Sequence, residues 1–212
     1  MSAAPERLMR TLRRHVADER VLEAIATVPR DCFVPEDLKH EAWDNIPLPI
    51  GSGQTISQPL VVARMCELLE LKGSETVLDV GTGSGYHAAL LAWLARHVYS
   101  IEVHESLSRQ AAANLRAAGV ENVTLVVGDG SRGVPEHAPY EAINVAAAAG
   151  GEIPPALAEQ LTYGGRLVAP VEDGEQRLVV ARRTQAGVTI TELERVRFVP
   201  LVSSHGSGAG SA

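Results

Sequence analysis

The chain has 212 residues, of which 45% are hydrophobic and 21% are charged, and its formal net charge is −7 at neutral pH. This length and composition fit one globular domain that buries its own core. The negative charge, the lack of a basic run and an aromatic content of 4% argue against a general nucleic-acid binder, which needs clustered lysines and arginines to contact phosphates. We therefore expect a single domain that does not bind nucleic acid.

Targeting and cysteine patterns point to the cytoplasm. Residues 1–35 carry several charged side chains and no apolar segment resembling a signal peptide, and no apolar run in the chain is long enough to cross a bilayer. Cys32 and Cys66 lie far apart, without the spacing of a metal site. We therefore predict a cytoplasmic protein with two reduced thiols, no membrane segment and no metal.

Residues 1–60 are predicted to form a helical cap and a shaped substrate loop. Apolar residues from Leu8 to Val28 recur at helical intervals among charges, until Pro29 ends the pattern. The stretch from Ile46 to Pro59 is rich in Pro and Gly, which indicates an irregular loop rather than a regular element. A helix over 58–69 is expected to follow this loop.

Residues 61–202 are predicted to form the core of the domain, because strand and helix patterns alternate from Thr76 onward. This alternation is typical of a doubly wound α/β sheet that is mostly parallel. After Gly164 and Gly165, further apolar runs predict antiparallel strands at the sheet edge. The predicted strands are 77–80, 98–103, 123–127, 142–145, 166–171, 178–182 and 196–202, and the predicted helices are 86–95 and 107–118. Residues 203–212, rich in Ser, Gly and Ala, are predicted to be a disordered tail.

Three alternate glycines follow the first of these strands and precede a helix. Glycines allow a strand-to-helix turn to take positive φ, and they let a ligand lie against bare backbone at the positive end of the helix. The third glycine of a dinucleotide fingerprint would stand at Tyr86, so the spacing favours S-adenosylmethionine over a nicotinamide dinucleotide. A purely structural turn is the alternative. The loop residues expected to bind the cofactor are Gly81, Thr82, Gly83, Ser84 and Gly85.

Acidic residues near the carboxyl ends of three predicted strands are the other candidate cofactor ligands. Asp79 precedes the glycines, where its carboxylate could hold the amides of the turn or reach the amino-acid end of the cofactor. Glu102 closes the next strand, at the distance where a carboxylate accepts hydrogen bonds from ribose hydroxyls. Asp129 and Gly130 close the third, although an Asp-Gly pair is also a common turn. Open parallel sheets bind ligands at this edge, which favours the binding role.

Two further segments are specific enough to indicate a family. Gly-Gln-Thr-Ile-Ser-Gln-Pro at 53–59 lies ahead of the glycine loop, and Arg-Phe-Val-Pro-Leu occupies 197–201. Together with Gly-Asp-Gly at 128–130 and Ile-Pro-Pro-Ala-Leu at 153–157, they make the chain resemble the protein-L-isoaspartate (D-aspartate) O-methyltransferases over nearly its whole length.

The resemblance implies a Rossmann-like fold of the class I S-adenosylmethionine-dependent methyltransferase type, with the helical cap and antiparallel C-terminal strands already expected. It implies methyl esterification of the free α-carboxyl of L-isoaspartyl and D-aspartyl residues in damaged proteins and peptides. The ester then gives a succinimide, which hydrolyses partly to normal aspartate. A carboxylate with a pKa of about 4 is already ionised at neutral pH, so no catalytic histidine is required.

The resemblance also implies roles for individual residues. Ser57, the serine of Thr-Ile-Ser-Gln-Pro, would place the substrate carboxylate, although a serine at this position can also cap the following helix. Asp129 and the amide beside it would bind the adenine edge, and Asp79 stands where relatives commonly have Glu. Substrate contacts are expected from Thr55, Ile56, Val199 and Leu201.

Departures from the family pattern leave alternatives open. Glu141 stands where relatives usually have Asp, and the alanines at 146–149 with Gly150 replace a Thr-Ala-Ala-Pro-like segment, so that Ala146 lacks a hydroxyl. A methyltransferase for the aspartate of a dedicated ribosomal peptide, a non-catalytic cofactor-binding module and, third, a dehydrogenase are the alternatives. His87 is expected at the surface or the cofactor edge rather than in catalysis. We expect a monomer.

Overall fold

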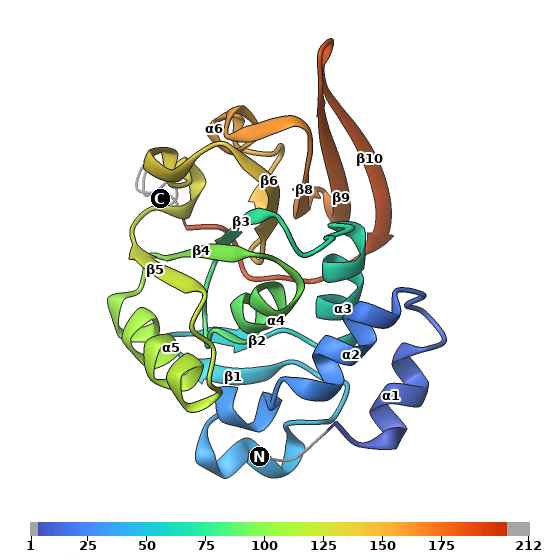
Figure 1. Ribbon diagram of the computed structural model, residues 1–212, viewed down its shortest axis with the longest axis vertical. Helices are drawn as coiled ribbons and strands as arrows, with labels where there is room; N and C mark the ends of the chain where they lie inside the picture. Colours follow the sequence, from blue (N-terminus) through green and yellow to red (C-terminus); the bar gives the residue numbers. More distant parts are fainter. Residues whose placement is uncertain (1–3, 203–212) are drawn as a thin grey trace, which may run out of the picture.

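A mostly parallel sheet of eight strands forms the centre of the structure, a computed structural model that describes residues 4–202. The strands are β3 (Thr76–Val80), β4 (His97–Glu102), β5 (Val123–Val127), β6 (Tyr140–Val145), β7 (Ala149–Gly150), β8 (Leu161–Asp173), β9 (Glu175–Thr184) and β10 (Gly187–Arg195). They run in the order β10-β9-β8-β6-β3-β4-β5, with β7 paired to β8 (Figure 1). The pairs from β5 to β8 are parallel, and β9 and β10 are antiparallel. The predicted fold class is confirmed.

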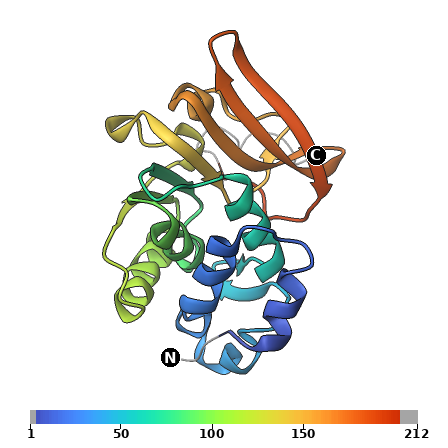
Figure 2. The same cartoon turned by 45° about the vertical axis from the view of Figure 1, so that its right-hand side comes forward.

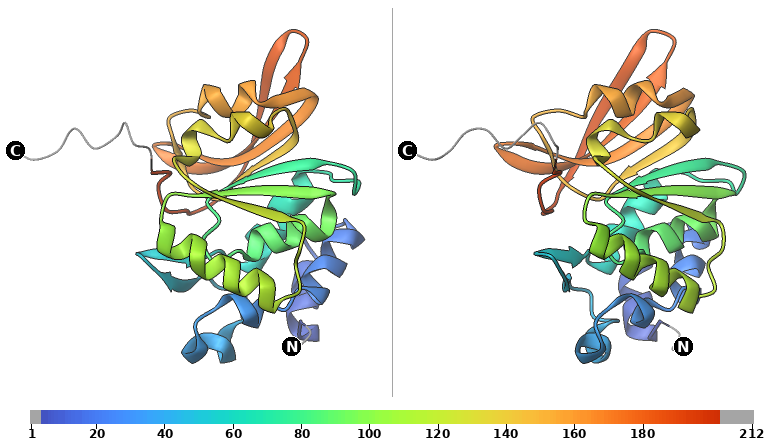
Figure 3. Two further views of the ribbon diagram at one scale, coloured as in Figure 1. Left: turned by 60° about the vertical axis from the view of Figure 1, so that its left-hand side comes forward. Right: turned by 90° about the vertical axis from the view of Figure 1, so that its left-hand side faces the viewer.

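Helices cover both faces of the sheet. Alternate side chains of a strand point to opposite faces, and β3 follows this rule. Val77 packs into a core shared with α4 (Tyr86–Leu94) and α5 (Glu105–Ala117), whereas Leu78 and Val80 pack into a second core shared with α6 (Pro155–Glu159). Figure 3 shows α4 and α5 on one side of the strands and α6 on the other. The predicted helices at 86–95 and 107–118 correspond to α4 and α5.

The N-terminal cap consists of short helices packed beside α3 (Pro59–Leu68) and α4. The cap contains α1 (Glu6–Leu12), α2 (Glu19–Thr27) and the 3-10 helices η1 (Arg30–Phe33) and η2 (Glu36–Glu41) (Figure 2). The helical pattern over 8–28 is thus divided into two helices. A new helix begins at residue 19 because Asp18 caps it, with the carboxylate accepting the amide of Arg20 at 2.9 Å.

The segment 46–59, predicted as an irregular loop, contains a short β-hairpin. β1 (Leu48–Gly51) pairs antiparallel with β2 (Gln54–Ile56). The tight reversal between them is possible because Gly51 and Gly53 take φ angles of 98° and 69°, which side chains other than glycine rarely adopt. The prediction of a wholly irregular loop is therefore wrong, and Thr55 and Ile56 lie on a strand.

The last strand of the sheet is β10, and not the strand predicted at 196–202. Residues 166–171 and 178–182 are confirmed within the longer strands β8 and β9, but residues 196–202 form no strand. They run as an extended segment with one parallel bridge between Ala148 and Pro200. The true edge strand, β10, was missed because its residues are exposed or half-buried and give no apolar run.

Three short 3-10 or single-turn elements complete the connections. They are η3 (Gly130–Arg132), η4 (Pro135–His137) and the single-turn helix α6. Within the described range, no helix combines the length and the apolar character that crossing a bilayer requires. The predicted tail at 203–212 lies outside the described residues.

Candidate active site

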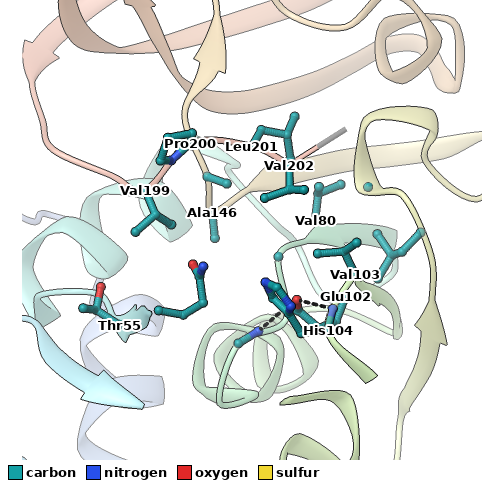
Figure 4. A pocket seen from close by; sticks show the side chains of 16 residues that line it. Thr55, Val80, Glu102, Val103, His104, Ala146, Val199, Pro200, Leu201 and Val202 are labelled. Carbon is teal, nitrogen blue, oxygen red and sulfur yellow. Dashed lines mark hydrogen bonds between the residues drawn. The ribbon is translucent and has the colours of Figure 1, made fainter. Parts of the chain in front are cut away.

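A cavity opens where β3 and β4 end, beside the loop that follows β6 (Figure 4). We call it the glycine-loop cavity. Among the predicted cofactor residues, it is lined by Gly81, Gly83, Glu102 and Gly130. Because the carboxyl ends of neighbouring parallel strands meet at one edge of the sheet, this is the position at which open α/β sheets bind ligands.

The glycine loop takes the backbone conformation that its sequence predicts. Gly81, Gly83 and Gly85 have φ angles of 90°, 54° and 90°. A Cβ atom on Gly83 would lie 3.2 Å from Cδ1 of Ile50, so this position has little room for a side chain. Gly85 is the N-cap of α4 and provides no side-chain cap. The first amides of α4 therefore lack intrahelical partners, which favours an anionic group near the loop.

Glu102 holds the loop in place. Its Oε2 accepts the amide of Gly83 at 2.9 Å and its Oε1 accepts the amide of His104 at 3.0 Å, as the dashed lines in Figure 4 mark. The side chain is buried but lines the cavity. Each carboxylate oxygen can accept more than one hydrogen bond, so this geometry is compatible with the predicted contact to ribose hydroxyls.

Asp79 does not face the cavity. Strand register places it between Ser100 of β4 and Asn144 of β6, and we call these three residues the buried polar row. Ser100 Oγ donates to Asp79 Oδ2 at 2.7 Å, and Asn144 Nδ2 donates to Asp79 Oδ1 at 2.7 Å. Desolvation raises the pKa of Asp79 to about 6, although both hydrogen bonds oppose the shift. Thus Glu102, and not Asp79, accepts the Gly83 amide.

The buried polar row continues at both ends. Thr82 Oγ1 lies 2.6 Å from Ser100 Oγ, and Asn144 Nδ2 lies 3.2 Å from His87 Nδ1. His87 is buried, with 7% exposure, so of the two expected positions the surface is wrong, and the cofactor edge stays a prediction. Desolvation lowers the pKa of His87 to about 3, which keeps the ring neutral at physiological pH.

A smaller hollow joins the glycine loop to Ser57, and we call it the Ser57 cavity. It is lined by Thr55, Ile56 and Ser57 on one side and by the loop residues 81–84 on the other. α3 begins at Pro59 with Gln58 as its N-cap, and no side chain caps it. Ser57 is therefore not the helix cap that sequence reasoning kept as an alternative, and its side chain is available to the cavity.

Arg30 is a supporting residue that sequence reasoning missed. Its side chain is fully buried and donates through Nε to the Ala42 carbonyl at 2.7 Å and through Nη2 to the Ser57 carbonyl at 3.0 Å. Its Cζ lies 4.8 Å from the ring centroid of Tyr86. The sequence contains one signal that could have indicated this role, namely an arginine among the apolar residues of 28–34. An arginine in such surroundings is expected to be buried, and a buried cation needs fixed hydrogen-bond partners.

The C-terminal segment forms the opposite wall of the glycine-loop cavity. Figure 4 shows Val199, Pro200 and Leu201 across from Glu102. The segment is fixed by Ala148, whose amide donates to the Val199 carbonyl and whose carbonyl accepts the Leu201 amide, each at 2.8 Å. The structure thus brings the predicted substrate residues Val199 and Leu201 to the cavity that Thr55 also lines.

The two departures from the family pattern lie in different places. Ala146 lines the glycine-loop cavity, the Ser57 cavity and an adjoining hollow that contains Phe198, so its missing hydroxyl affects the site directly. Glu141 instead accepts the amide of Thr76 at 2.7 Å, at the amino-terminal ends of β3 and β6. This is the end of the sheet opposite the site.

Asp129 and Gly130 are adjacent in the sequence but face different hollows. The Asp129 carboxylate accepts the amide and the hydroxyl of Ser131, at 3.0 and 2.6 Å, and caps η3. It lines a different hollow from Gly130. A Cβ atom on Gly130 would lie 2.6 Å from Cγ1 of Val80, so only glycine fits there. The predicted contact of Asp129 and Gly130 with the adenine edge is not tested by this arrangement and stays a prediction.

The sheet, the glycine loop and the acid that ends β4 together define the class of Rossmann-like methyltransferases that use S-adenosylmethionine. Solved structures agree. One protein-L-isoaspartate O-methyltransferase superposes with a TM-score of 0.86 and 27% identity, covering 95% of this chain and 67% of its own. A Plasmodium falciparum protein provisionally named as such an enzyme, whose structure contains S-adenosyl-L-homocysteine, gives 0.80 and 24%, covering 95% and 99%.

Sequence comparison identifies the family within this class. The family profile described as protein-L-isoaspartate(D-aspartate) O-methyltransferase matches residues 3–206, and the chain belongs to this family. A protein-L-isoaspartate O-methyltransferase from Aeromonas hydrophila subsp. hydrophila is 50% identical over 195 residues, which are 92% of this chain and 95% of the relative. No group of three or more metal-ligating side chains occurs among residues 4–202.

Proposed function

We propose that the chain transfers the methyl group of S-adenosylmethionine to the free α-carboxyl of L-isoaspartyl and D-aspartyl residues in damaged proteins and peptides. Membership of the family supports this reaction. The structural observation that carries the proposal is that Ser57 lines one cavity together with Gly81 and Gly83. The segment that distinguishes the family and the loop that is typical of the cofactor therefore face each other.

The residues of the glycine-loop cavity fit S-adenosylmethionine. The bare backbone at Gly81 and Gly83 permits close approach, and Glu102 would accept hydrogen bonds from the ribose. Asp129 and Gly130 would contact the adenine edge, and Asp79 would act behind the loop by fixing Ser100 and Asn144. When bound, the cofactor supplies an electrophilic methyl group on a sulfonium. The loop residues proposed for its amino-acid end are Gly81, Thr82, Gly83, Ser84 and Gly85.

The remaining work of the site is orientation and exclusion of water. The attacking carboxylate is already an anion at neutral pH, since its pKa is about 4. Ser57 would donate a hydrogen bond to one carboxylate oxygen and leave the other free to attack in line with the methyl carbon and sulfur. Holding reactants in this way supplies several kcal/mol, up to roughly 7 to 11 in ideal cases. Thr55, Ile56, Val199 and Leu201 would line the path of the peptide.

Repair then proceeds from the ester without a further residue of the site. The backbone nitrogen of the following residue attacks the ester carbonyl and loses its proton, and methanol leaves. The succinimide that results takes up water and opens partly to normal aspartyl peptide. The chain needs only to esterify.

We infer that residues 1–202 act as one domain and as a monomer in the cytoplasm. One chain supplies every wall of both cavities described above. The edge strand β10 carries Glu192, Glu194 and Arg195, and such charges oppose pairing with a second sheet. Cys32 and Cys66 are free thiols, as expected in a reducing compartment, and the net charge of −7 disfavours nucleic acid. Light scattering of the purified protein and cell fractionation test the two inferences.

The decisive experiment supplies labelled S-adenosylmethionine with two peptides that differ only in carrying isoaspartyl or normal aspartyl at one position. We expect methyl ester on the isoaspartyl peptide alone. Ser57→Ala is expected to lower kcat by about tenfold or more while the affinity for S-adenosyl-L-homocysteine is unchanged, because one hydrogen bond to a charged group is lost. The control is Ser106→Ala, at an exposed position of α5.

Two results would count against the proposal in different ways. Esterification of neither peptide, or of both equally, would refute the assigned substrate. Full turnover by Ser57→Ala would refute the role of Ser57 and leave the reaction intact.

A further inference from the structure

His87 carries a buried ring nitrogen with no hydrogen-bond partner among the described residues. Its Nε2 is shielded from solvent and unpaired, and the residue is 7% exposed. Buried polar atoms in folded proteins are nearly always paired, so an unpaired one indicates a ligand or an ordered water that completes it. His87 lines the Ser57 cavity. The unpaired nitrogen therefore belongs to a residue at the candidate active site.

The buried polar row fixes which nitrogen of the ring carries the proton. Ser100 donates to one oxygen of Asp79, and the amide nitrogen of Asn144 donates to the other. The same Nδ2 lies 3.2 Å from His87 Nδ1, within reach of its second hydrogen. An amide nitrogen only donates, so Nδ1 must accept and the neutral ring carries its proton on Nε2. The unpaired Nε2 of His87 is thus a hydrogen-bond donor.

The surroundings of this donor favour an anionic acceptor. His87 is the second residue of α4, whose first turn contains no acidic side chain and whose N-cap Gly85 supplies no capping group. The positive end of a helix stabilises negative charge. The Ser57 cavity has a volume of about 40 Å³, which accommodates a few atoms, as in a carboxylate.

We propose that the Nε2–H of His87 donates a hydrogen bond to the carboxylate of a ligand in the Ser57 cavity, and so makes the site selective for ligands that carry one. The inference rests on the proposed function. In that reaction two carboxylates enter the site, the one on the methionine portion of the cofactor and the α-carboxylate of the isoaspartyl substrate. The chemistry of recognition is the same for both, and the experiment distinguishes them.

The first test removes and restores the donor. His87→Leu has no hydrogen-bonding group, and His87→Gln keeps an N–H donor. Affinities are measured by calorimetry for S-adenosyl-L-homocysteine and for methylthioadenosine, which shares the nucleoside and the thioether but lacks the amino-acid carboxylate. Steady-state kinetics with the isoaspartyl peptide give kcat and KM. His40→Leu, at an exposed histidine of η2, is the matched control.

If the cofactor carboxylate is the acceptor, His87→Leu binds S-adenosyl-L-homocysteine about tenfold to a hundredfold more weakly and binds methylthioadenosine as the wild type does. If the substrate carboxylate is the acceptor, S-adenosyl-L-homocysteine binding is unchanged and the peptide KM rises by a similar factor. His87→Gln restores most of the loss in either case. Equal weakening of both nucleosides, or no change in affinity and KM, would overturn the inference.

A second measurement avoids any dependence on the folding of a variant. Two-bond ¹H–¹⁵N spectra of the wild type labelled in its histidines report the tautomer of each ring. We expect His87 to be neutral with its proton on Nε2, and this Nε2 resonance to shift on addition of S-adenosyl-L-homocysteine or of peptide. A proton on Nδ1, or no shift with either ligand, refutes the inference. A wild type that forms no ester refutes instead the proposed function.

Discussion

The buried guanidinium of Arg30 donates a hydrogen bond from Nη2 to the carbonyl oxygen of Ser57, at 3.0 Å and across 27 positions of the sequence. The same group holds the Ala42 carbonyl in the cap and lies against the ring of Tyr86, the first residue of α4. One side chain thus fixes the cap, the Ser57 segment and the helix after the glycine loop relative to one another.

Arg30→Lys is expected to impair both stability and turnover. An ammonium group cannot reproduce the planar arrangement by which arginine reaches two carbonyls. We expect the free energy of unfolding to fall by about 2 to 4 kcal/mol, because hydrogen bonds from charged donors contribute about 1.5 to 3 kcal/mol each. We also expect kcat per folded molecule to fall by about tenfold, since a small displacement of a positioning group has an effect of this order. Urea unfolding and steady-state kinetics measure the two effects.

Arg20→Lys is the matched control for this variant. Arg20 also holds two backbone carbonyls, those of Leu71 and Leu94, at 2.6 and 3.2 Å, and it lines neither of the two cavities. The Arg20→Lys protein should be less stable than the wild type and have an unchanged kcat. An equal loss of kcat in both variants would show that Arg30 has no specific effect on Ser57.

Glu102→Gln is expected to weaken cofactor binding. The two carboxylate oxygens accept the amides of Gly83 and His104, and glutamine would turn one acceptor into an NH₂ group that faces an N–H. We expect the dissociation constant for S-adenosyl-L-homocysteine to rise by about tenfold, which corresponds to about 1.4 kcal/mol. Glu105→Gln, which alters an exposed ion pair with Arg109, should leave calorimetric affinity unchanged. Unchanged affinity in Glu102→Gln would contradict the assignment.

Gly83→Val should abolish most cofactor binding. A β-branched side chain at a φ of 54° is strained, and its Cβ would press on Ile50 while it blocked the approach of a ligand to the backbone. Gly174→Val imposes similar strain at a φ of 71° in the turn between β8 and β9. A Cβ atom at this position would have no atom within 4 Å apart from its own residue and its chain neighbours. Both variants should lose stability, and only Gly83→Val should lose affinity, by at least about tenfold in calorimetry.

The stability of the fold in acid should depend on His87. Its pKa is about 3 in the folded protein against an ordinary 6.5, so below about pH 6.5 the unfolded chain binds a proton that the folded chain does not, and stability is lost as the pH falls. Asp79 acts in the opposite sense. Its pKa is raised to about 6, so the folded chain takes up a proton first and this group favours the folded state increasingly between about pH 6 and 4.

Removing the histidine should therefore change the pH profile in one direction. Relative to wild type, His87→Gln should gain about 2 kcal/mol of unfolding free energy between pH 7 and pH 5, at about 1.4 kcal/mol per pH unit below 6.5. Urea unfolding at the two pH values measures the difference. A constant difference between the two proteins would mean that the pKa of His87 is the same in the folded and the unfolded chain.

The parallel half of the sheet could be predicted from the sequence, whereas its antiparallel edge could be predicted only in part. β3, β4 and β6 are buried strands, so their apolar runs show in the sequence. β10 is solvent-exposed along nearly all its length, and its alternation of Thr, Val, Ile and Glu gives no core face. The segment at 196–202 is apolar because it covers the cavities, and for that reason it resembled a strand.

Within the site, the parts encoded by short motifs could be located and the parts that depend on tertiary contacts could not. The glycine loop and Glu102 follow from local spacing. The partners of Asp79 depend on how β3 aligns with β4 and β6, and Asn144 lies 65 positions away. The burial of His87 and the contact between Arg30 and Ser57 arise in the same way, from segments that are brought together only by folding.

The buried polar row also bears on how the sheet assembles. Ser100, Asp79 and Asn144 stand directly opposite one another on adjacent strands. A slip of two residues would keep every side chain on its own face of the sheet, so the apolar pattern alone would accept it. Such a slip would place Asp79 beside Val98 or Glu102 on β4, or beside Ala142 on β6 or Ala146 directly after it, and leave a buried carboxylate short of a partner. The polar side chains behind the site thus also select the correct register of the strands that carry it.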